Sequence, residues 1–222
     1  MNKESNILSV ENYFTSPIYW IEKKEFIPIT SKVAKEYLDI QKKSQSLNKI
    51  YPVYMSGSME NDSRLYDLVL YIASTSWNIL NEQGFNMDLY EVFVQELWAQ
   101  EHHTTSSMDE HVHGLGSQVS GFYVLDGPED SSKIVICDPR PGKNQINLLE
   151  RDPRNLTYAS QKVLFNPIPG NLYFTNSWLP HEFTRNSSSK PFTFLHFNVG
   201  ARYKTVTPVK TAENNVIPVE II

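Results

Sequence analysis

The chain has 222 residues, enough for one sizeable core, and a second domain is possible but not required. Its 25 acidic and 20 basic residues give a formal net charge of −5, so the composition shows no footprint for nucleic acid or an anionic membrane. The single cysteine, Cys137, excludes an intrachain disulfide framework and a cysteine-based zinc ribbon. The first residues lack a secretory apolar stretch and no run reaches membrane-spanning length, so we expect a cytoplasmic protein.

Two amphipathic segments dominate the first part of the chain. Residues 30–49 place apolar side chains at helical spacing, with a Thr-Ser pair at the start as candidate N-caps. Residues 62–83 repeat the pattern, with Asp62 able to cap the start and Gly84 following the end. The linker between them carries proline and glycine and predicts a loop. We expect both helices to pack on one face of the structure that follows.

From residue 88 onward the pattern changes to short runs rich in aromatic and β-branched residues. The predicted strands cover residues 89–99, 118–125, 133–138, 162–166, 171–176 and 191–199. Turn-forming residues separate them, which favours an antiparallel sandwich or barrel over a doubly wound parallel sheet. The expected fold class is therefore α+β and mainly β. We interpret residues 139–161 as a loop near a functional mouth, and residues 205–222 as a possible edge strand confined there by its prolines.

Six histidines are the main candidates for chemistry. In an extended chain, residues i and i+2 point to the same face, so His111 and His113 can act as neighbouring metal ligands. A mononuclear site needs a third ligand from a distant segment, and His181, in "SWLPHEF" after a predicted strand, is the natural candidate. We interpret His102 and His103 as loop residues or residues outside the ligand set. His196 is expected to face the core or a sheet surface rather than to bind metal.

Two questions about this ligand set stay open at the level of the residues. Asp109 lies two positions before His111, so an Asp-x-His pair has the same geometry as His-x-His. That choice gives two histidines and one carboxylate, the usual face for non-haem Fe(II). Three histidines can also hold zinc with an activated water, for which Asp109 or Glu110 is the nearest general base.

The segments "HVHGLGSQVSGFYVL", "CDPR", "IPGNLYFTNSWLPHEFTRN" and "FLHFN" together resemble a known family. They are similar to the 2-oxoglutarate/Fe(II)-dependent oxygenases related to prolyl 4-hydroxylases, in particular to a small group found in bacteria and phages. The resemblance extends from Asn12 to about Asn198 and is strongest in residues 111–126 and 169–198.

The resemblance implies a double-stranded β-helix, a jelly-roll or cupin-like barrel, with the N-terminal helices on one face. It implies Fe(II) as cofactor and O₂ and 2-oxoglutarate as co-substrates. The ligand motif of the wider superfamily maps onto His111, His113 and His181, with histidine at position 113 where the superfamily has a carboxylate. Asp109 is the rival for that third place.

The resemblance also implies residues that bind the co-substrate and the prime substrate. The distal carboxylate of 2-oxoglutarate needs a buried cation, for which we expect Lys190, with Arg185 as the alternative; both can also be ordinary loop charges. Tyr123 and Ser120 are expected to face the pocket and hydrogen-bond 2-oxoglutarate, although Tyr123 can equally be a core aromatic. At the mouth we expect Arg140, Trp178 and Trp98 to shape substrate binding, with core packing as the other interpretation of both tryptophans.

We therefore predict a dioxygenase that hydroxylates a peptide, such as a peptidyl proline, or a small molecule. The alternatives are a three-histidine enzyme that does not use 2-oxoglutarate, either a zinc hydrolase or an iron dioxygenase, and a non-catalytic jelly-roll binding module. No nucleic-acid or membrane partner is expected, and the sequence leaves the oligomeric state open. We expect one domain over residues 1–222, with helical support in 1–87, the barrel in 88–205 and a C-terminal extension in 206–222.

Overall fold

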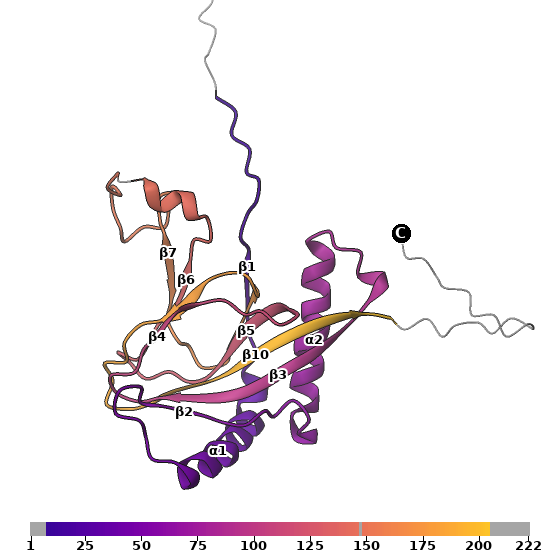
Figure 1. The fold of residues 1–222 in the computed structure, drawn as a ribbon, viewed down its shortest axis with the longest axis vertical. Helices are drawn as coiled ribbons and strands as arrows, with labels where there is room; N and C mark the ends of the chain where they lie inside the picture. Colours follow the sequence, from indigo (N-terminus) through magenta and orange to yellow (C-terminus); the bar gives the residue numbers. More distant parts are fainter. Residues whose placement is uncertain (1–7, 147, 205–222) are drawn as a thin grey trace, which may run out of the picture.

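Residues 8–146 and 148–204 are described by the computed structural model of this chain. The predicted C-terminal extension and its edge strand lie outside them. Two α-helices and ten β-strands form the fold (Figure 1). They are β1 (Ile18–Glu22), α1 (Ile27–Ser44), β2 (Val53–Met55), α2 (Tyr66–Glu82), β3 (Tyr90–His102), β4 (Met108–His111), β5 (Ser117–Asp126), β6 (Ile134–Cys137), β7 (Lys162–Phe165), β8 (Asn171–Asn176), β9 (His181–Phe183) and β10 (Phe192–Tyr203). Short 3₁₀ turns span Lys24–Phe26, Ser63–Leu65, Met87–Leu89 and Pro141–Gln145.

The strands form two antiparallel sheets. The larger sheet has the order β1-β8-β5-β10-β3-β2, and the smaller has the order β4-β9-β6-β7. From β3 to β10 the chain passes repeatedly between the two sheets, and only β6 and β7 are consecutive within one sheet. This arrangement is a double-stranded β-helix, as the sequence predicts. The six strands predicted between residues 89 and 199 are all present, whereas β1, β2, β4 and β9 were not predicted.

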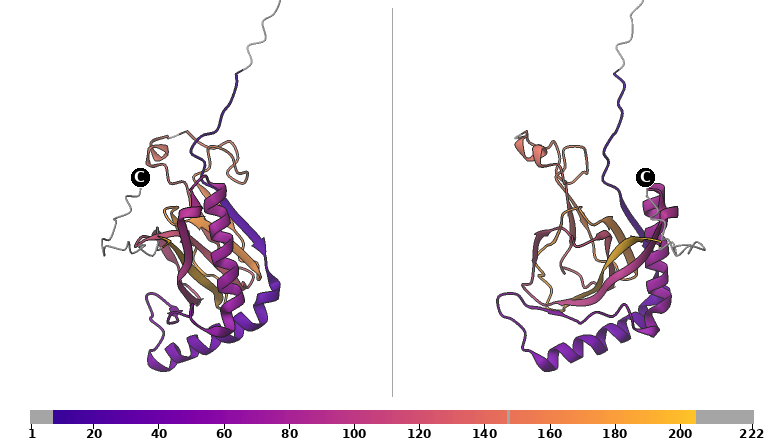
Figure 2. Two further views of the ribbon diagram at one scale, coloured as in Figure 1. Left: turned by 90° about the vertical axis from the view of Figure 1, so that its right-hand side faces the viewer. Right: turned by 45° about the vertical axis from the view of Figure 1, so that its right-hand side comes forward.

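Both helices cover the outer face of the larger sheet, where they pack against β3 (Figure 2). Because side chains alternate along a strand, one set of residues faces the helices and the other faces the barrel interior. Leu97, Leu195 and Phe197 belong to the core shared with the helices. Phe122, Phe194 and Phe183 belong to a second core between the two sheets. The alternation thus separates a helix-facing layer from a barrel interior.

The helix boundaries differ partly from the predicted ones. α1 begins at Ile27, directly after a 3₁₀ turn and with a proline in its first turn, so the predicted Thr-Ser cap lies inside the helix. Asp62 does cap its segment: its side chain accepts a hydrogen bond from the backbone of Arg64 at the start of the 3₁₀ turn that leads into α2. Gly84 follows α2 with a φ of +94°, a conformation that glycine adopts at low cost.

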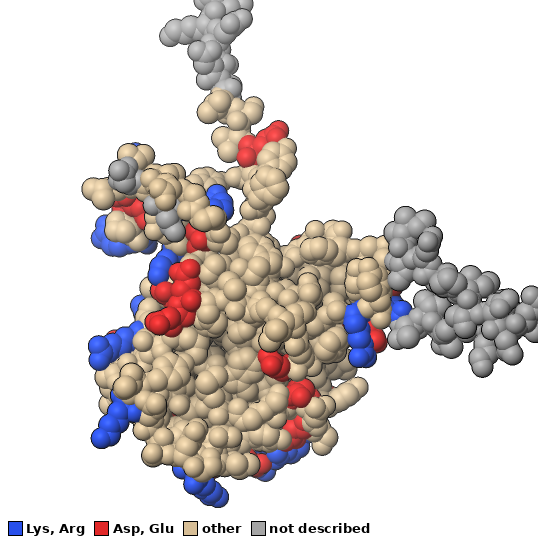
Figure 3. Space-filling view, viewed as in Figure 1, with Lys and Arg blue, Asp and Glu red and all other residues tan. Residues whose placement is uncertain are grey.

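The surface charges are dispersed. On the face shown in Figure 3, acidic and basic side chains form small separate groups with uncharged surface between them. Within the described part of the chain, neither helix is long and apolar enough to cross a membrane.

Candidate metal centre

Three histidines from two segments of the chain meet where β4 pairs with β9. Antiparallel pairing of β4 with β9 places His111 opposite His181. His113 follows β4, and its backbone N–H donates to the carbonyl of Ser177, which holds it beside β9. One ring nitrogen from each of the three lies within 4.8 Å of the others. The Nε2 atoms of His113 and His181 are 3.2 Å apart. The structure therefore assembles the three histidines that the sequence pattern selected.

Backbone contacts orient two of these rings for metal binding. Nδ1 of His111 lies 2.8 Å from the carbonyl oxygen of Asp109, and Nδ1 of His181 lies 3.2 Å from that of Leu179. A carbonyl oxygen only accepts, so each Nδ1 carries the proton and donates it. The Nε2 atom of each ring is then left with its lone pair, which is the state that a metal requires.

Burial keeps two of these histidines, His113 and His181, neutral. His181 is 1% exposed, and burial, together with His111, lowers its pKa to about 3. Burial and the neighbouring His111 lower the pKa of His113 to about 4. At neutral pH both rings are therefore unprotonated and available as ligands.

Asp109 does not join this group. Its side chain is exposed, and it is absent from the metal-ligand clusters in the described residues, where only its backbone carbonyl contacts His111. His113 rather than Asp109 therefore supplies the third converging side chain.

A fourth histidine lies directly against the triad. His196, in β10, has its ring centroid 4.4 Å from that of His113 and 4.4 Å from that of Trp98, on which it stacks. Phe122 contacts it edge-on. Burial is the main cause that lowers the pKa of His196 well below its ordinary value. It faces the barrel, one of the two placements expected from the sequence, but its contact with the triad was not predicted.

The comparisons with known proteins agree with this geometry. Residues 96–198 match the model of a family described as "Putative 2OG-Fe(II) oxygenase". This segment contains all of the strands from β4 to β9, together with about half of β3 and about half of β10. A search of curated proteins finds no match. Over this stretch, a little under half of its length, the chain is similar to the 2-oxoglutarate/Fe(II)-dependent oxygenases.

Solved structures of proteins named as α-ketoglutarate-dependent enzymes or prolyl hydroxylases share the fold. The epimerase SnoN in complex with Fe³⁺, α-ketoglutarate and nogalamycin RO aligns with a TM-score of 0.58 at 10% identity, covering 90% of this chain and 89% of that one. A Pseudomonas putida prolyl-4-hydroxylase gives 0.55 at 13% identity, with 83% and 92% covered. A Trichoplax adhaerens prolyl hydroxylase bound to a hypoxia inducible factor peptide fragment gives 0.52 at 12% identity, with 83% and 84% covered.

The oxygenase family uses Fe(II), 2-oxoglutarate and O₂, and the triad fits the metal of this set. One imidazole nitrogen from each of three histidines, on two adjacent strands and just after β4, lies close enough to the others to share one metal ion. All three ligands are neutral, so a bound Fe(II) keeps its full charge, in contrast to a site with one carboxylate.

The barrel interior between the two sheets is mainly aromatic. Side chains of Phe122, Phe183, Phe192 and Phe194 contact one another between the sheets and are at most 2% exposed. No Lys or Arg is among the buried residues of the described chain. The expected buried cation is therefore not found: Lys190 and Arg185 are both exposed on the loop between β9 and β10.

The two expected hydrogen-bonding residues of β5 lie on opposite faces. Tyr123 packs in the helix-facing core, and its hydroxyl donates to the carbonyl of Lys23, so it does not reach the triad. Ser120 is buried, and its hydroxyl donates to Oδ1 of Asn198 at 2.8 Å. Asn198 in turn donates to Glu96 at 2.8 Å. Ser120 thus belongs to a polar chain across β5, β10 and β3 on the same strand face as Phe122.

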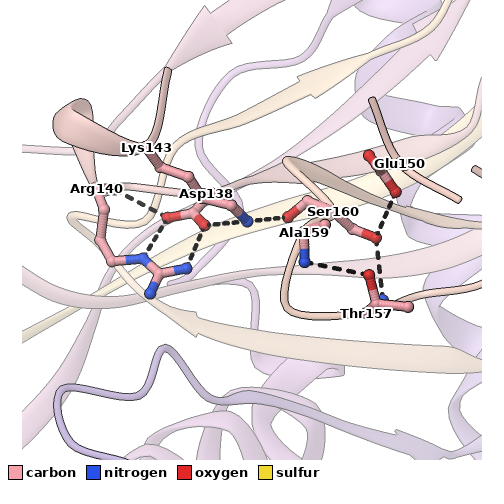
Figure 4. A network of polar contacts seen from close by, with 7 residues as sticks. All are labelled: Asp138, Arg140, Lys143, Glu150, Thr157, Ala159 and Ser160. Atoms are coloured by element: carbon pink, nitrogen blue, oxygen red, sulfur yellow. Dashed lines mark hydrogen bonds and ion pairs between the residues drawn. The ribbon is translucent and has the colours of Figure 1, made fainter. Parts of the chain in front are cut away.

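The predicted mouth residues Arg140 and Trp178 lie in two different loops. Trp178 is 49% exposed in the loop that joins β8 to β9. Arg140 donates to Asp138 through Nε and Nη2 at 2.9 and 2.6 Å, and Lys143 pairs with the same carboxylate at 2.9 Å and donates to the carbonyl of Ser160 (Figure 4). This network ties the start of the long 139–161 loop to its end.

A cleft of about 260 Å³ lies beside this network. It is bounded by residues 12–16, by the loop residues Arg140 and Tyr158, and by Leu179, two positions before His181. Aromatic and charged groups thus line a cavity next to the segment that leads into β9, and none of the three histidines is among its lining residues. The expected mouth residue Arg140 contributes to it, whereas Trp178 does not border it.

Proposed function

We propose that this protein is a hydroxylase in which His111, His113 and His181 hold Fe(II), and that its prime substrate is a prolyl peptide. The observation that supports the metal assignment is the short distance between ring nitrogens of these three histidines. With metal and 2-oxoglutarate bound, such a site supplies the oxidation of a C–H bond to C–OH by O₂, with release of succinate and CO₂.

The chain's own residues position and shield this chemistry. The carbonyl groups of Asp109 and Leu179 hold two of the rings in the ligand tautomer. Phe122 packs edge-on against His181 and closes the barrel side of the site, which excludes water there. His111 and His113 are partly exposed, so the opposite side is open to a substrate.

The cleft and the structural neighbours support a peptide as the substrate. Tyr13, Phe14 and Tyr158 line the cleft next to Leu179, and aromatic faces pack well against the pyrrolidine ring of proline. Two structural neighbours are named prolyl hydroxylases, one of them in complex with a peptide. We further propose that residues 1–222 form one oxygenase domain, with residues 1–87 as its helical support.

Anaerobic spectroscopy tests the metal and co-substrate parts of this proposal. Addition of Fe(II) and then 2-oxoglutarate should produce the weak visible charge-transfer band of a chelated complex. The 2-oxoglutarate analogue N-oxalylglycine should stabilise the loaded protein against heat. Absence of both effects would contradict the proposed 2-oxoglutarate-dependent function. Prolyl peptides that gain the mass of one oxygen atom, and do so only with 2-oxoglutarate present, identify the substrate class.

One observation favours a second candidate, an iron dioxygenase with three histidine ligands that needs no 2-oxoglutarate. The described barrel interior contains no buried Lys or Arg to hold the distal carboxylate. Oxygen consumption separates the two functions. The proposed hydroxylase consumes O₂ and substrate only when 2-oxoglutarate is present and forms one succinate for each hydroxylated product. Substrate oxidation without 2-oxoglutarate would establish the second candidate instead.

A further inference from the structure

His196 is an unsatisfied polar side chain inside the barrel. It is 2% exposed, and neither Nδ1 nor Nε2 has a hydrogen-bond partner in the structure. A neutral imidazole carries one donor and one acceptor, and leaving such groups buried without partners costs free energy. Most buried polar groups in proteins are paired, so two orphaned nitrogens on one ring indicate that a ligand completes the site.

The position of His196 indicates which ligand this is. Its ring centroid lies 4.4 Å from that of His113 and 6.2 Å from that of His181. On the opposite strand it stacks on Trp98, whose buried Nε1 also has no partner. The stack and the edge-on contact with Phe122 leave the ring little freedom to turn away. His196 is therefore a fixed donor on the barrel side of the metal ligands.

The same region lacks a buried cation for an anionic ligand. In β10, Phe192 and Phe194 precede His196 on the same strand face, and both are fully buried. No Lys or Arg lies among the buried side chains of residues 8–146 and 148–204. A carboxylate that enters between the sheets must therefore rely on the metal and on neutral donors, of which His196 is the nearest to the triad.

We propose that His196 donates a hydrogen bond to the metal-chelating carboxylate of the 2-oxo acid co-substrate. This inference rests on the proposed 2-oxoglutarate-dependent function. His196 is thus a binding residue for the co-substrate and not a metal ligand. Hydrogen bonds to charged groups are stronger than those between neutral groups, and this one acts in a dry interior where competition from water is small.

Two variants separate the hydrogen bond from the packing of the ring. His196→Phe keeps an aromatic ring against Trp98 but removes the donor, whereas His196→Gln keeps an N–H donor. His102→Phe is the matched control, because His102 is also a fully buried histidine with an orphaned Nδ1, but it packs against Phe183, Phe192 and Phe194 rather than the triad. All three proteins are loaded with Fe(II) under anaerobic conditions and titrated with 2-oxoglutarate, with the charge-transfer band as readout.

The expected results are distinct for each protein. In His196→Phe the Kd for 2-oxoglutarate should rise by about 10- to 100-fold, the loss of one hydrogen bond to a charged group, while Fe(II) affinity stays unchanged. His196→Gln should recover most of that loss, and His102→Phe should bind 2-oxoglutarate as the wild type does. The monocarboxylic acid 2-oxobutyrate, which has only the chelating end, should be weakened by the same factor.

Four outcomes overturn the inference, and one outcome concerns the proposed function instead. Unchanged 2-oxoglutarate affinity in His196→Phe removes the donor role. Loss of Fe(II) in that variant makes His196 a metal ligand or a support for one. Weakening of 2-oxoglutarate but not of 2-oxobutyrate places the contact at the distal carboxylate. If His196→Phe does not fold, the Gln variant decides: loss of 2-oxoglutarate binding with a retained donor contradicts the inference. Absence of any band in the wild type overturns the proposed function itself.

Discussion

The Nε2 atoms of His113 and His181 lie 3.2 Å apart, although 68 residues separate them in the chain. The Nδ1 proton of His181 is directed to the carbonyl of Leu179, so its Nε2 carries a lone pair. The pKa values of these two imidazoles are lowered to about 4 and about 3, so they do not share a positive charge at neutral pH. The arrangement satisfies both nitrogens when a cation lies between them.

Removal of one ligand tests this interpretation. His181→Ala removes a nitrogen supplied by the most buried ring of the triad, so the affinity for Fe(II) should fall by more than about 100-fold, beyond the 10- to 100-fold that outer partners of ligands cost. Anaerobic titration with Fe(II), followed by thermal unfolding, measures the change. Asp109→Asn is the control: its side chain is exposed and outside the triad, so this variant should bind Fe(II) as the wild type does. The reverse result would make Asp109 the third ligand.

A substitution at position 113 can introduce the carboxylate that the wider superfamily has there. His113→Asp should retain Fe(II) binding, because the position already converges with His111 and His181. A carboxylate lowers the charge of the bound metal, so the charge-transfer band of the 2-oxoglutarate complex should shift in energy. His113→Ala, which offers no ligand, should lose metal instead. Equal loss of metal in both variants would show that the shorter Asp side chain does not reach the site.

The long strands could be predicted from the sequence because they carry continuous β-branched and aromatic runs. β4 and β9 have only four and three residues, partly polar, and exist because they pair with each other across the smaller sheet. The alternation of side chains along an extended strand correctly selected His111 and His113 as neighbours. The structural reason differs in part, because β4 ends at His111 and the hydrogen bond to Ser177 positions His113. Lys190 was expected to bind 2-oxoglutarate because it lies near His181 along the chain. Whether its side chain is buried or exposed depends on the path of the loop before β10, which the sequence does not give.

Lys190 and Arg185, the exposed cations of the loop before β10, should contribute little to 2-oxoglutarate binding. Lys190→Ala and Arg185→Ala should each change the Kd for 2-oxoglutarate by less than about fivefold, because exposed charges contribute at most about 1 kcal/mol to an ion pair. Anaerobic titration of the Fe(II)-loaded variants measures this. A large loss in either variant, with Fe(II) binding intact, would show that the loop folds inward and supplies the cation expected from the family resemblance.

Close packing at β5 makes Gly121 a sensitive position. A Cβ there would lie 2.1 Å from the backbone oxygen of Tyr173 and 2.3 Å from Cζ of Phe197. Gly121→Ala should therefore destabilise the protein by about 1–3 kcal/mol or more, because a backbone atom on β8 cannot move aside locally. Gly57→Ala is the matched control, since no atom lies within 4 Å of its added Cβ. Urea unfolding of both variants gives the comparison; equal stability would mean that the strands separate without cost.

His102 should make the stability of the fold sensitive to acid. Its ring is fully buried among Phe183, Phe192 and Phe194, and its Nε2 lies 2.9 Å from Oε1 of Gln100, to which it donates. Burial, with a smaller contribution from His103, lowers its pKa from 6.5 to about 4. The folded protein therefore keeps His102 neutral at pH values where the unfolded chain has already bound a proton.

The sign of the pH effect follows from this difference. Below pH 6.5 the unfolded state takes up a proton that the folded state refuses, so stability is lost as the pH falls from 6.5 to about 4 and then levels off. His102 alone should contribute about 3 kcal/mol to this loss, at about 1.4 kcal/mol for each pH unit. His102→Phe cannot titrate, so its free energy of unfolding should fall less steeply over that range. Urea unfolding of metal-free protein at several pH values measures the two slopes. The variant also leaves Gln100 without its partner, which shifts the absolute stability at every pH but not the slope, so identical slopes would show that His102 binds its proton equally well in the folded state.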